Sequence, residues 1–142
     1  MAVRGAGHVR LELSRRGDYA VRAMLTLASP SAGWLTAAQL AERTAIPVSF
    51  VPQVMGDLVR AGFVSTRRGR RGGYAIARDP SEVFLLGSVD AVDRDRRLRS
   101  CVLRGGSCGA DGTHCAVHDA FDGASRAATD ALASVSLAEL DL

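Results

Sequence analysis

The chain has 142 residues, 47% of them hydrophobic and 23% charged, with a formal net charge of +3. This length suits one ordinary domain, or a small domain with an appendage, and the apolar content is sufficient for a buried core. No run of about 18 apolar residues occurs, so we expect no membrane span. The first residues lack the apolar stretch of a secretory signal, and we expect a cytoplasmic protein.

The charge is unevenly distributed along the chain. All 18 basic residues are arginine, and 12 of them lie in residues 1–78 against four acids, a net charge of +8. Residues 79–142 carry six arginines against 11 acids, a net charge of −5. The basic N-terminal half of the sequence suits a polyanionic partner. The acidic C-terminal half argues against nonspecific binding of polyanions over the whole surface.

Two helices are predicted in the first part of the chain. Ser14 suits an N-cap, and apolar residues then recur at helical spacing until Ser29-Pro30 ends the helix. Thr36 and Gln39 have the spacing of a capping box, which predicts a second helix over 37–44.

A third helix is predicted after a short turn at residues 45–47. Ser49 is expected to cap it, Pro52 is tolerated because it falls in the first turn, and Gly62 suits the position just after the helix end. Its buried stripe is expected to be Val51, Val54, Met55, Leu58 and Val59. Two helices joined by a tight turn are what a helix-turn-helix requires, although an ordinary helical hairpin has the same pattern.

A basic hairpin is predicted directly after these helices. Residues 63–66 and 74–77 have the pattern of two strands, and the loop between them holds four arginines and three glycines. From Leu58 to Arg78 there are six arginines and no acid. A solvated surface normally mixes both signs, so this arginine-tipped wing favours contact with a minor groove or with phosphates over a merely solvated hairpin.

The last third of the chain predicts one long helix. Residues 83–92 are expected to return to the core, and 94–99 to form a charged connector. From Ala116 to about Val135, apolar residues recur at spacings of 4, 3, 4, 3 and 4. This seam consists of Val117, Phe121, Ala124, Ala128, Ala131 and Val135. Small seam residues favour close pairing with a second copy of the helix, although packing on the chain's own core is the alternative.

All three cysteines lie in one glycine-rich stretch, CVLRGGSCGADGTHCAVH, at residues 101–118. Six residues separate Cys101 from Cys108 and Cys108 from Cys115, and His118 follows three residues after the last. The glycines disfavour a helix, since each costs roughly 1 kcal/mol there relative to alanine, and they permit a tight wrapping loop. Thiolates spaced along such a loop are good ligands for a soft metal centre.

Residue types alone leave several interpretations of this loop. Three thiolates and one imidazole suit zinc as well as an iron–sulfur cluster, although no C-x-x-C knuckle typical of structural zinc is present. Without a metal, two of the thiols would form a redox switch. An enzyme is disfavoured, because no phosphate loop, paired carboxylate or nucleophile motif accompanies the three histidines.

Four segments of the chain resemble one known family. They are LSRRGDYAVRAML, LAERTAIPVSFVPQVMGDLVRAGFV, RRGRRGGYAIAR and the three cysteines followed by CAVH. Together they resemble the Rrf-type family of winged-helix, iron–sulfur-dependent bacterial transcriptional regulators (IscR- and NsrR-like), from about Leu13 to Leu140. Two features depart from the family's pattern. Each gap between cysteines is six residues where well-known members usually have five, and Pro52 stands where many relatives have a glutamate.

The resemblance implies a homodimer in which Cys101, Cys108 and Cys115 ligate an iron–sulfur cluster of two or four irons. The fourth ligand would be His118 or Asp18 of the partner subunit, with His114 a weaker candidate. The expected role is that of a transcriptional repressor that binds a palindromic site in double-stranded DNA and responds to nitric oxide, redox state or iron supply. The residues expected at the DNA are Thr36, Ser49, Gln53, Arg60, Arg67, Arg68, Arg70 and Arg71.

The expected architecture is mainly α with a small β-hairpin wing: a winged helix-turn-helix plus a long C-terminal dimerisation helix. Its expected parts are a disordered N-terminus (1–12), a DNA-binding domain (13–93), a connector and cysteine cluster loop (94–118), and the dimerisation helix with its terminal turn (116–142).

Overall fold

The computed structural model of the chain describes residues 11–93, 103, 108 and 113–140. Within these ranges the fold is mainly helical with one two-stranded antiparallel sheet, which confirms the predicted fold class. In chain order the elements are α1 (Arg15–Ala28), α2 (Ala37–Thr44), α3 (Val51–Arg60), β1 (Val64–Arg67), β2 (Gly73–Ile76), the 3-10 turn η1 (Pro80–Glu82), α4 (Leu85–Val92), α5 (His118–Ser134) and the 3-10 turn η2 (Leu137–Glu139). None of the helices in the described ranges is long and apolar enough to cross a membrane.

Some predictions fall outside the described residues. They concern residues 1–10 of the N-terminus, the connector at 94–99, and Cys101, and they stay predictions.

The first two helices begin where predicted because each has a side-chain cap. At the start of α1, the Ser14 hydroxyl accepts a hydrogen bond of 3.0 Å from the backbone N–H of Gly17. At the start of α2, the Thr36 hydroxyl accepts from the Gln39 N–H, and the Gln39 side chain accepts from the Thr36 N–H. This reciprocal pair is the predicted capping box.

The prediction that Ser49 caps the third helix is wrong. The helix begins at Val51, Phe50 occupies the N-cap position, and no side chain caps it. The residues just before the helix already form a turn, in which the Phe50 N–H donates to the Pro47 carbonyl at 2.9 Å. Ser49 therefore lies inside that turn. Pro52 lies in the first helical turn, as predicted, where an N–H would have no partner within the helix.

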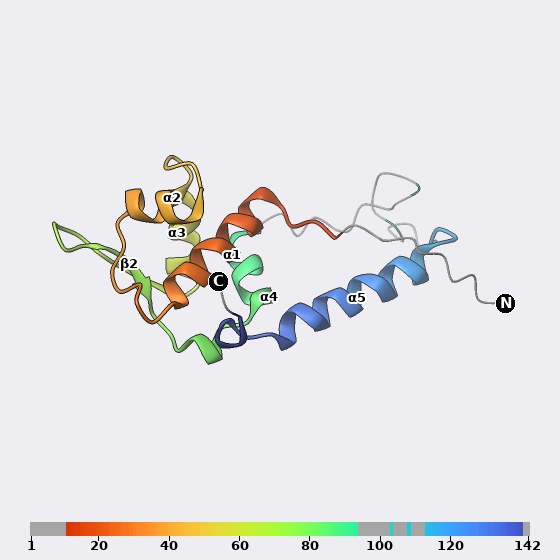
Figure 1. Cartoon of the computed structure of the whole chain (residues 1–142). Coiled ribbons are helices and arrows are strands. Elements are labelled where there is room, and N and C mark those ends of the chain that lie inside the picture. Colours follow the sequence, from red (N-terminus) through yellow and green to blue (C-terminus); the bar gives the residue numbers. More distant parts are fainter. Residues whose placement is uncertain (1–10, 94–102, 104–107, 109–112, 141–142) are drawn as a thin grey trace.

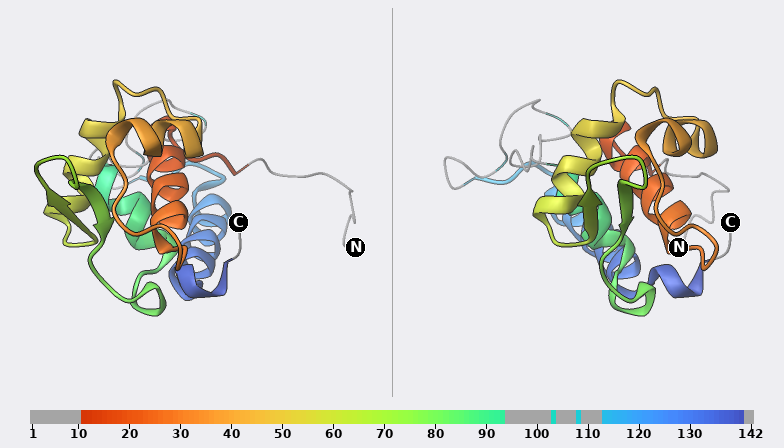
Figure 2. Two further views of the ribbon diagram at one scale, coloured as in Figure 1. Left: turned by 60° about the vertical axis from the view of Figure 1, so that its left-hand side comes forward. Right: turned by 90° about the vertical axis from the view of Figure 1, so that its left-hand side faces the viewer.

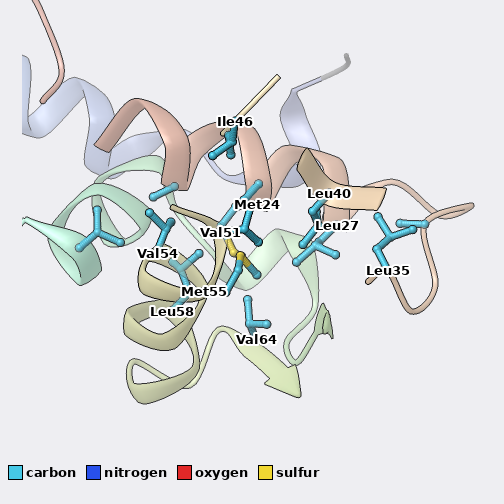
Figure 3. Close-up of a cluster of buried hydrophobic side chains, with 14 of the residues drawn as sticks. Met24, Leu27, Leu35, Leu40, Ile46, Val51, Val54, Met55, Leu58 and Val64 are labelled. Carbon is cyan, nitrogen blue, oxygen red and sulfur yellow. The ribbon is translucent and has the colours of Figure 1, made fainter. Parts of the chain in front are cut away.

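One hydrophobic core joins the helices and the hairpin (Figure 3). The four residues of α3 that are at most 1% exposed are Val51, Val54, Met55 and Leu58. Figure 3 shows these side chains gathered with Met24 of α1 and Val64 of β1. The predicted stripe is therefore confirmed, apart from Val59, which is only half-buried. Because the stripe covers one face of α3, the opposite face is left exposed.

The wing is a hairpin fastened to the segment between α1 and α2. Its strands pair antiparallel with Val64 opposite Ile76, and they lie one residue after and one residue before the predicted ranges 63–66 and 74–77. Leu35 pairs with the outer side of β2, where it exchanges backbone hydrogen bonds of 2.9 and 2.7 Å with Tyr74. This pairing sets the position of the wing relative to α2.

The chain after α5 returns to the segment before α4. The Leu137 N–H donates to the Val83 carbonyl at 2.8 Å, and the Leu137 side chain is 1% exposed. The predicted capping of this last turn is confirmed, since Ser136 and Glu139 form a capping box. Ser136 donates hydrogen bonds to the Glu139 carboxylate from its backbone N–H and from its hydroxyl. Both bonds lower the pKa of the Glu139 carboxyl below its ordinary value, and the backbone bond has the larger effect.

The long helix α5 projects from the rest of the molecule (Figure 1). We call α1–α4 with the hairpin the head. The C-terminal end of α5 lies beside the head, whereas its N-terminal end, where the cysteine loop joins, points away from the wing. The right-hand view of Figure 2 shows the wing in front and α5 behind the head. The helix starts at His118 instead of the predicted Ala116, because residues 116–117 form a turn.

Gly73→Ala is expected to destabilise the wing more than the control Gly69→Ala. Both glycines have positive φ, +123° and +103°, so backbone strain is common to the two variants. Only at residue 73 would the new Cβ collide, 2.1 Å from the Leu35 carbonyl oxygen, since nothing lies within 4 Å of a Cβ at residue 69. Thermal unfolding measures the difference. Equal losses of stability would contradict the close approach of Leu35 to Gly73.

Candidate nucleic-acid interface and metal centre

The face of α3 opposite the core carries polar side chains. Pro52 and Gln53 are exposed, Gly56 is half-buried, and the Arg60 side chain is 62% exposed. With 3.6 residues per turn, these four positions lie within about 100° of one another around the helix. Such a face fits a major groove, where a glutamine amide pairs with adenine and a guanidinium with guanine. Gln53 and Arg60 therefore lie on the exposed face of α3, and their contacts with DNA stay predictions.

Gly56 lies at the centre of this face, and sequence reasoning did not single it out. A Cβ at this position would meet only Arg60 Nη1, at 3.8 Å, so alanine would fit the head without a clash. The missing side chain leaves the helix backbone bare between Gln53 and Arg60. A bare backbone permits close approach of a ligand.

A hydrogen bond from α1 stabilises the turn between α2 and α3. Ala45 is in the left-handed region with φ +57°, and Arg22 of α1 donates to the neighbouring Thr44 carbonyl at 3.3 Å. Arg22 also pairs with Asp18, one helical turn earlier, at 2.8 Å. Asp18, a candidate metal ligand, is therefore engaged by an arginine within its own chain.

Two of the residues predicted at the DNA are exposed near α3. Thr36 lies at the start of α2, where its hydroxyl also accepts the capping hydrogen bond, and Ser49 lies in the turn before α3. Both positions are open to a ligand, and their contacts with DNA stay predictions.

The four arginines of the wing differ in their surroundings. The Arg67 guanidinium lies 4.2 Å from the centroid of the Trp34 ring, and its Nε donates to the Arg71 carbonyl at 3.1 Å. Since Trp34 precedes Leu35, this stacking braces the hairpin on the segment to which β2 is already paired. Arg68, Arg70 and Arg71 are exposed, and the described part of the chain supplies no acid partner for them. These three side chains are the ones available for phosphates.

A buried carboxylate supports α3 next to its exposed face. The Asp57 side chain is 1% exposed and pairs with Arg16 of α1 and with Arg60 of its own helix. Arg60, which was predicted to contact DNA, thus has an internal partner as well. Neither this ion-pair network nor the Arg67–Trp34 contact was inferred from the sequence, because each joins residues from different elements.

The described part of the loop brings Cys108 and Cys115 together. The Cys115 N–H donates to Cys108 Sγ at 3.2 Å, and both residues are half-buried. Sulfur is a good ligand for a soft metal, and a hydrogen bond to a ligating sulfur tunes the reduction potential of the cluster that it holds. The donors present therefore fit a soft metal centre. Cys101, the third predicted ligand, lies outside the described residues.

His118 begins α5 close to these cysteines. Its backbone N–H donates to the Cys115 carbonyl at 3.1 Å, and its ring stacks on His114 with centroids 3.7 Å apart. Ligand atoms of His114, His118 and Asp119 lie within 4.8 Å of one another. The His118 backbone thus lies beside Cys115, and its role as a ligand stays a prediction.

The predicted seam of α5 is only partly covered in the single chain. No described residue of α5 is fully buried. The half-buried apolar residues near its C-terminal end are Ala128, Leu132 and Val135. The exposed ones are Phe121, at 49%, Ala124 and Ala131. An apolar stripe of this kind favours a second helix as its cover.

Known proteins match this chain over most of its length. A family profile described as "Rrf2: Iron-dependent Transcriptional regulator" matches residues 13–141. The HTH-type transcriptional regulator IscR of Xenorhabdus nematophila is 35% identical over 131 residues, which cover 92% of this chain and 79% of that protein. The IscR of Photorhabdus laumondii is 36% identical over 131 residues, with the same two coverages of 92% and 79%.

Two solved structures share the fold. T. potens IscR superposes with a TM-score of 0.72 at 23% identity, over 91% of this chain and 85% of that one. CymR (YrzC), described as the global cysteine regulator of B. subtilis, has a TM-score of 0.72 at 21% identity, over 92% of this chain and 95% of that one. Because the family profile and the relatives cover nearly the whole chain, the protein belongs to the Rrf2 family of DNA-binding transcriptional regulators and is not an enzyme.

Proposed function

We propose that this regulator is a homodimeric repressor whose affinity for DNA is controlled by an iron–sulfur cluster that responds to nitric oxide, redox state or iron supply. The observation that carries the proposal is the hydrogen bond of 3.2 Å from the Cys115 N–H to Cys108 Sγ, which orders two of the three thiols in one loop. Thiolates held in this way are suitable ligands for a soft metal centre.

DNA recognition would use α3 and the wing together. The exposed face of α3, with Gln53 and Arg60, would enter the major groove, and Arg68, Arg70 and Arg71 would contact the flanking backbone or minor groove. Two heads related by a two-fold axis would read a palindromic site with half-sites about 34 Å apart, one turn of the duplex.

Dimerisation would bury the apolar stripe of α5. Phe121, Ala124 and Ala131 lie exposed along this helix, and small side chains let two helices approach closely. Pairing of the projecting helices would also carry the cysteine loop of one chain toward the head of the other. This geometry supports a cluster site shared between subunits.

Cys101, Cys108 and Cys115 would hold the cluster, with His118 or Asp18 of the partner subunit as the fourth ligand. The outer end of α5 projects beyond the head (Figure 1), where a second subunit could approach and supply an aspartate ligand. A bound cluster of two or four irons would supply a redox-active centre at the dimer interface. An oxygen or nitrogen ligand among three thiolates would be the labile one.

Control of DNA binding requires more than a change in the loop. A signal shifts DNA affinity only if the two states of the loop differ in how well the heads bind DNA. The described residues place the loop at one end of α5 and the head at the other. We therefore expect the signal to act on the relative orientation of the two heads.

Two alternatives use the same cysteines. Zinc held by Cys101, Cys108, Cys115 and His118 would make a structural site. A cluster-free redox switch would join two thiols on oxidation. One solved structure with this fold is described as the oxidized form of Staphylococcus aureus CymR, and the closeness of Cys108 to Cys115 is compatible with such a switch.

Protein purified without oxygen is expected to be coloured, because iron–sulfur clusters absorb visible light. Cys108→Ala removes one sulfur ligand and is expected to abolish the colour but leave the dimer, whereas the neighbouring control Ser107→Ala should keep both. Absorption and Mössbauer spectra, metal analysis and sedimentation measure these outcomes. A colourless wild type with stoichiometric zinc would favour the zinc site, and unfolding of Cys108→Ala would indicate a structural metal.

Ala124→Glu is expected to convert the dimer into monomers, because it places a charge on the exposed apolar stripe of α5. Ala133→Glu is the matched control: it is also exposed, and nine residues further on it lies on the opposite side of the helix. Sedimentation at several protein concentrations distinguishes the two. A stable Ala124→Glu dimer would show that another surface pairs the subunits.

Arg70→Gln combined with Arg71→Gln is expected to weaken binding to every DNA sequence alike. Each lost phosphate contact should lower the slope of log affinity against log salt by about 1. Arg67→Gln is the comparison, because the Arg67 guanidinium stacks on Trp34 and its removal should lower the melting temperature as well. A strong sequence-selective loss in the double variant would mean that these arginines read bases.

A further inference from the structure

We propose that Asp57 is a positioning residue, which through its ion pair with Arg16 fixes the rotation of α3 against α1 and so determines how selectively the protein reads DNA. The inference rests on the proposed use of α3 as the helix that enters the major groove. It concerns a residue that would not itself touch DNA.

The contacts of Asp57 join two elements. Its side chain is 1% exposed, and it pairs with Arg16, a residue 41 positions away in the first turn of α1. It also pairs with Arg60, three positions later on α3. The Arg16 pair therefore ties α3 to α1, whereas the Arg60 pair lies within α3.

The exposure of the two arginines indicates which pair matters more for orientation. The Arg16 side chain is 40% exposed and that of Arg60 is 62% exposed. The Arg60 pair joins two residues of the same helix, so it cannot resist movement of α3 against α1. The less exposed pair between α1 and α3 is the one that can resist movement of one helix past the other.

The ion pair between Asp57 and Arg16 is directional, and the apolar contacts of the stripe are not. Apolar contacts depend mainly on area and are non-directional, so the stripe allows small rotations of α3 at little cost. A buried carboxylate is costly unless it stays paired, and a well-packed apolar residue is often as stable in its place. The ion pair therefore has its main value in specifying one orientation of the helix.

The position of Asp57 on the helix makes this orientation relevant to DNA. Gln53 lies one turn before it and Arg60 one turn after it, and both side chains are exposed. A helix with its side chains has a radius of about 5–6 Å, so a rotation of about 20° moves a tip by about 2 Å. Hydrogen bonds to base edges span only about 2.7–3.2 Å, so a shift of that size would break them. Contacts with phosphates, made by flexible arginines of the wing, would survive it.

The test compares Arg16→Gln with Arg126→Gln in the full chain. Both remove one arginine that pairs with an aspartate, but the Arg126–Asp122 pair of 2.8 Å lies within α5, where the Arg126 side chain is 75% exposed. A duplex is first selected by the wild-type protein from a randomised pool. The affinity of each variant is then measured for this duplex and for a scrambled duplex of the same composition, with the melting temperature recorded alongside.

Arg16→Gln is expected to lower the ratio of selected to scrambled affinity by about tenfold, as for the loss of one bidentate base contact. Its affinity for scrambled DNA and its salt slope should match those of Arg126→Gln, and the ratio of Arg126→Gln should equal that of the wild type. Arg16→Lys, which keeps the charge, should recover the ratio. Asp57→Asn keeps the shape of the side chain and part of its hydrogen bonding. It should lower the ratio of selected to scrambled affinity as Arg16→Gln does.

A lower melting temperature with an unchanged ratio in Arg16→Gln would overturn the inference, because Asp57 would then be only structural. If Arg16→Gln does not fold, the ratio for Asp57→Asn decides in the same way. A wild-type protein that selects no sequence from the pool would refute the proposed reading function, and the positioning role with it. Selection by the wild type together with an unchanged ratio in both variants would refute the positioning role alone.

Discussion

Packing of the α3 stripe against α1 is the constraint on which the rest of the structure depends. Val54 and Leu58 are buried on that side, so Gln53 and Arg60 are turned outward. The core therefore determines which face of α3 is turned outward, toward the proposed contacts with bases. The close approach of Gly73 to Leu35 does the same for the wing, since it joins the hairpin to the segment that leads into α2.

The projection of α5 divides the molecule into two parts with different requirements. The head, together with Leu137 of η2, contains the buried apolar core, whereas α5 keeps an exposed apolar stripe with Phe121 near its outer end. The cysteine loop joins α5 at that same end (Figure 1). A cluster bound there would influence the orientation of the heads only if two chains pair. The proposed sensing therefore depends on dimerisation.

Sequence reasoning succeeded where a few neighbouring residues decide the outcome. The caps at Ser14 and Thr36 and the apolar stripe of α3 depend on side chains three or four positions apart, so each could be recognised locally. Ser49 failed as a cap because the turn before α3 places Phe50 at the helix start, and the conformation of that turn depends on how α2 and α3 pack. The strands lie one residue away from the predicted ranges because their register runs from Val64–Ile76 to Arg67–Gly73.

The sequence by itself determined the helices, the basic hairpin and the grouping of three thiols in one loop, since composition and short-range spacing carry that information. Tertiary structure alone decided that Arg16 meets Asp57 across 41 residues, that Arg67 stacks on Trp34, and that Arg22 reaches the Thr44 carbonyl. The physical reason is that an arginine has the same sequence signature whether it faces phosphate, an aromatic ring or a buried carboxylate. Only the packing of the helices determines which of these partners lies within reach.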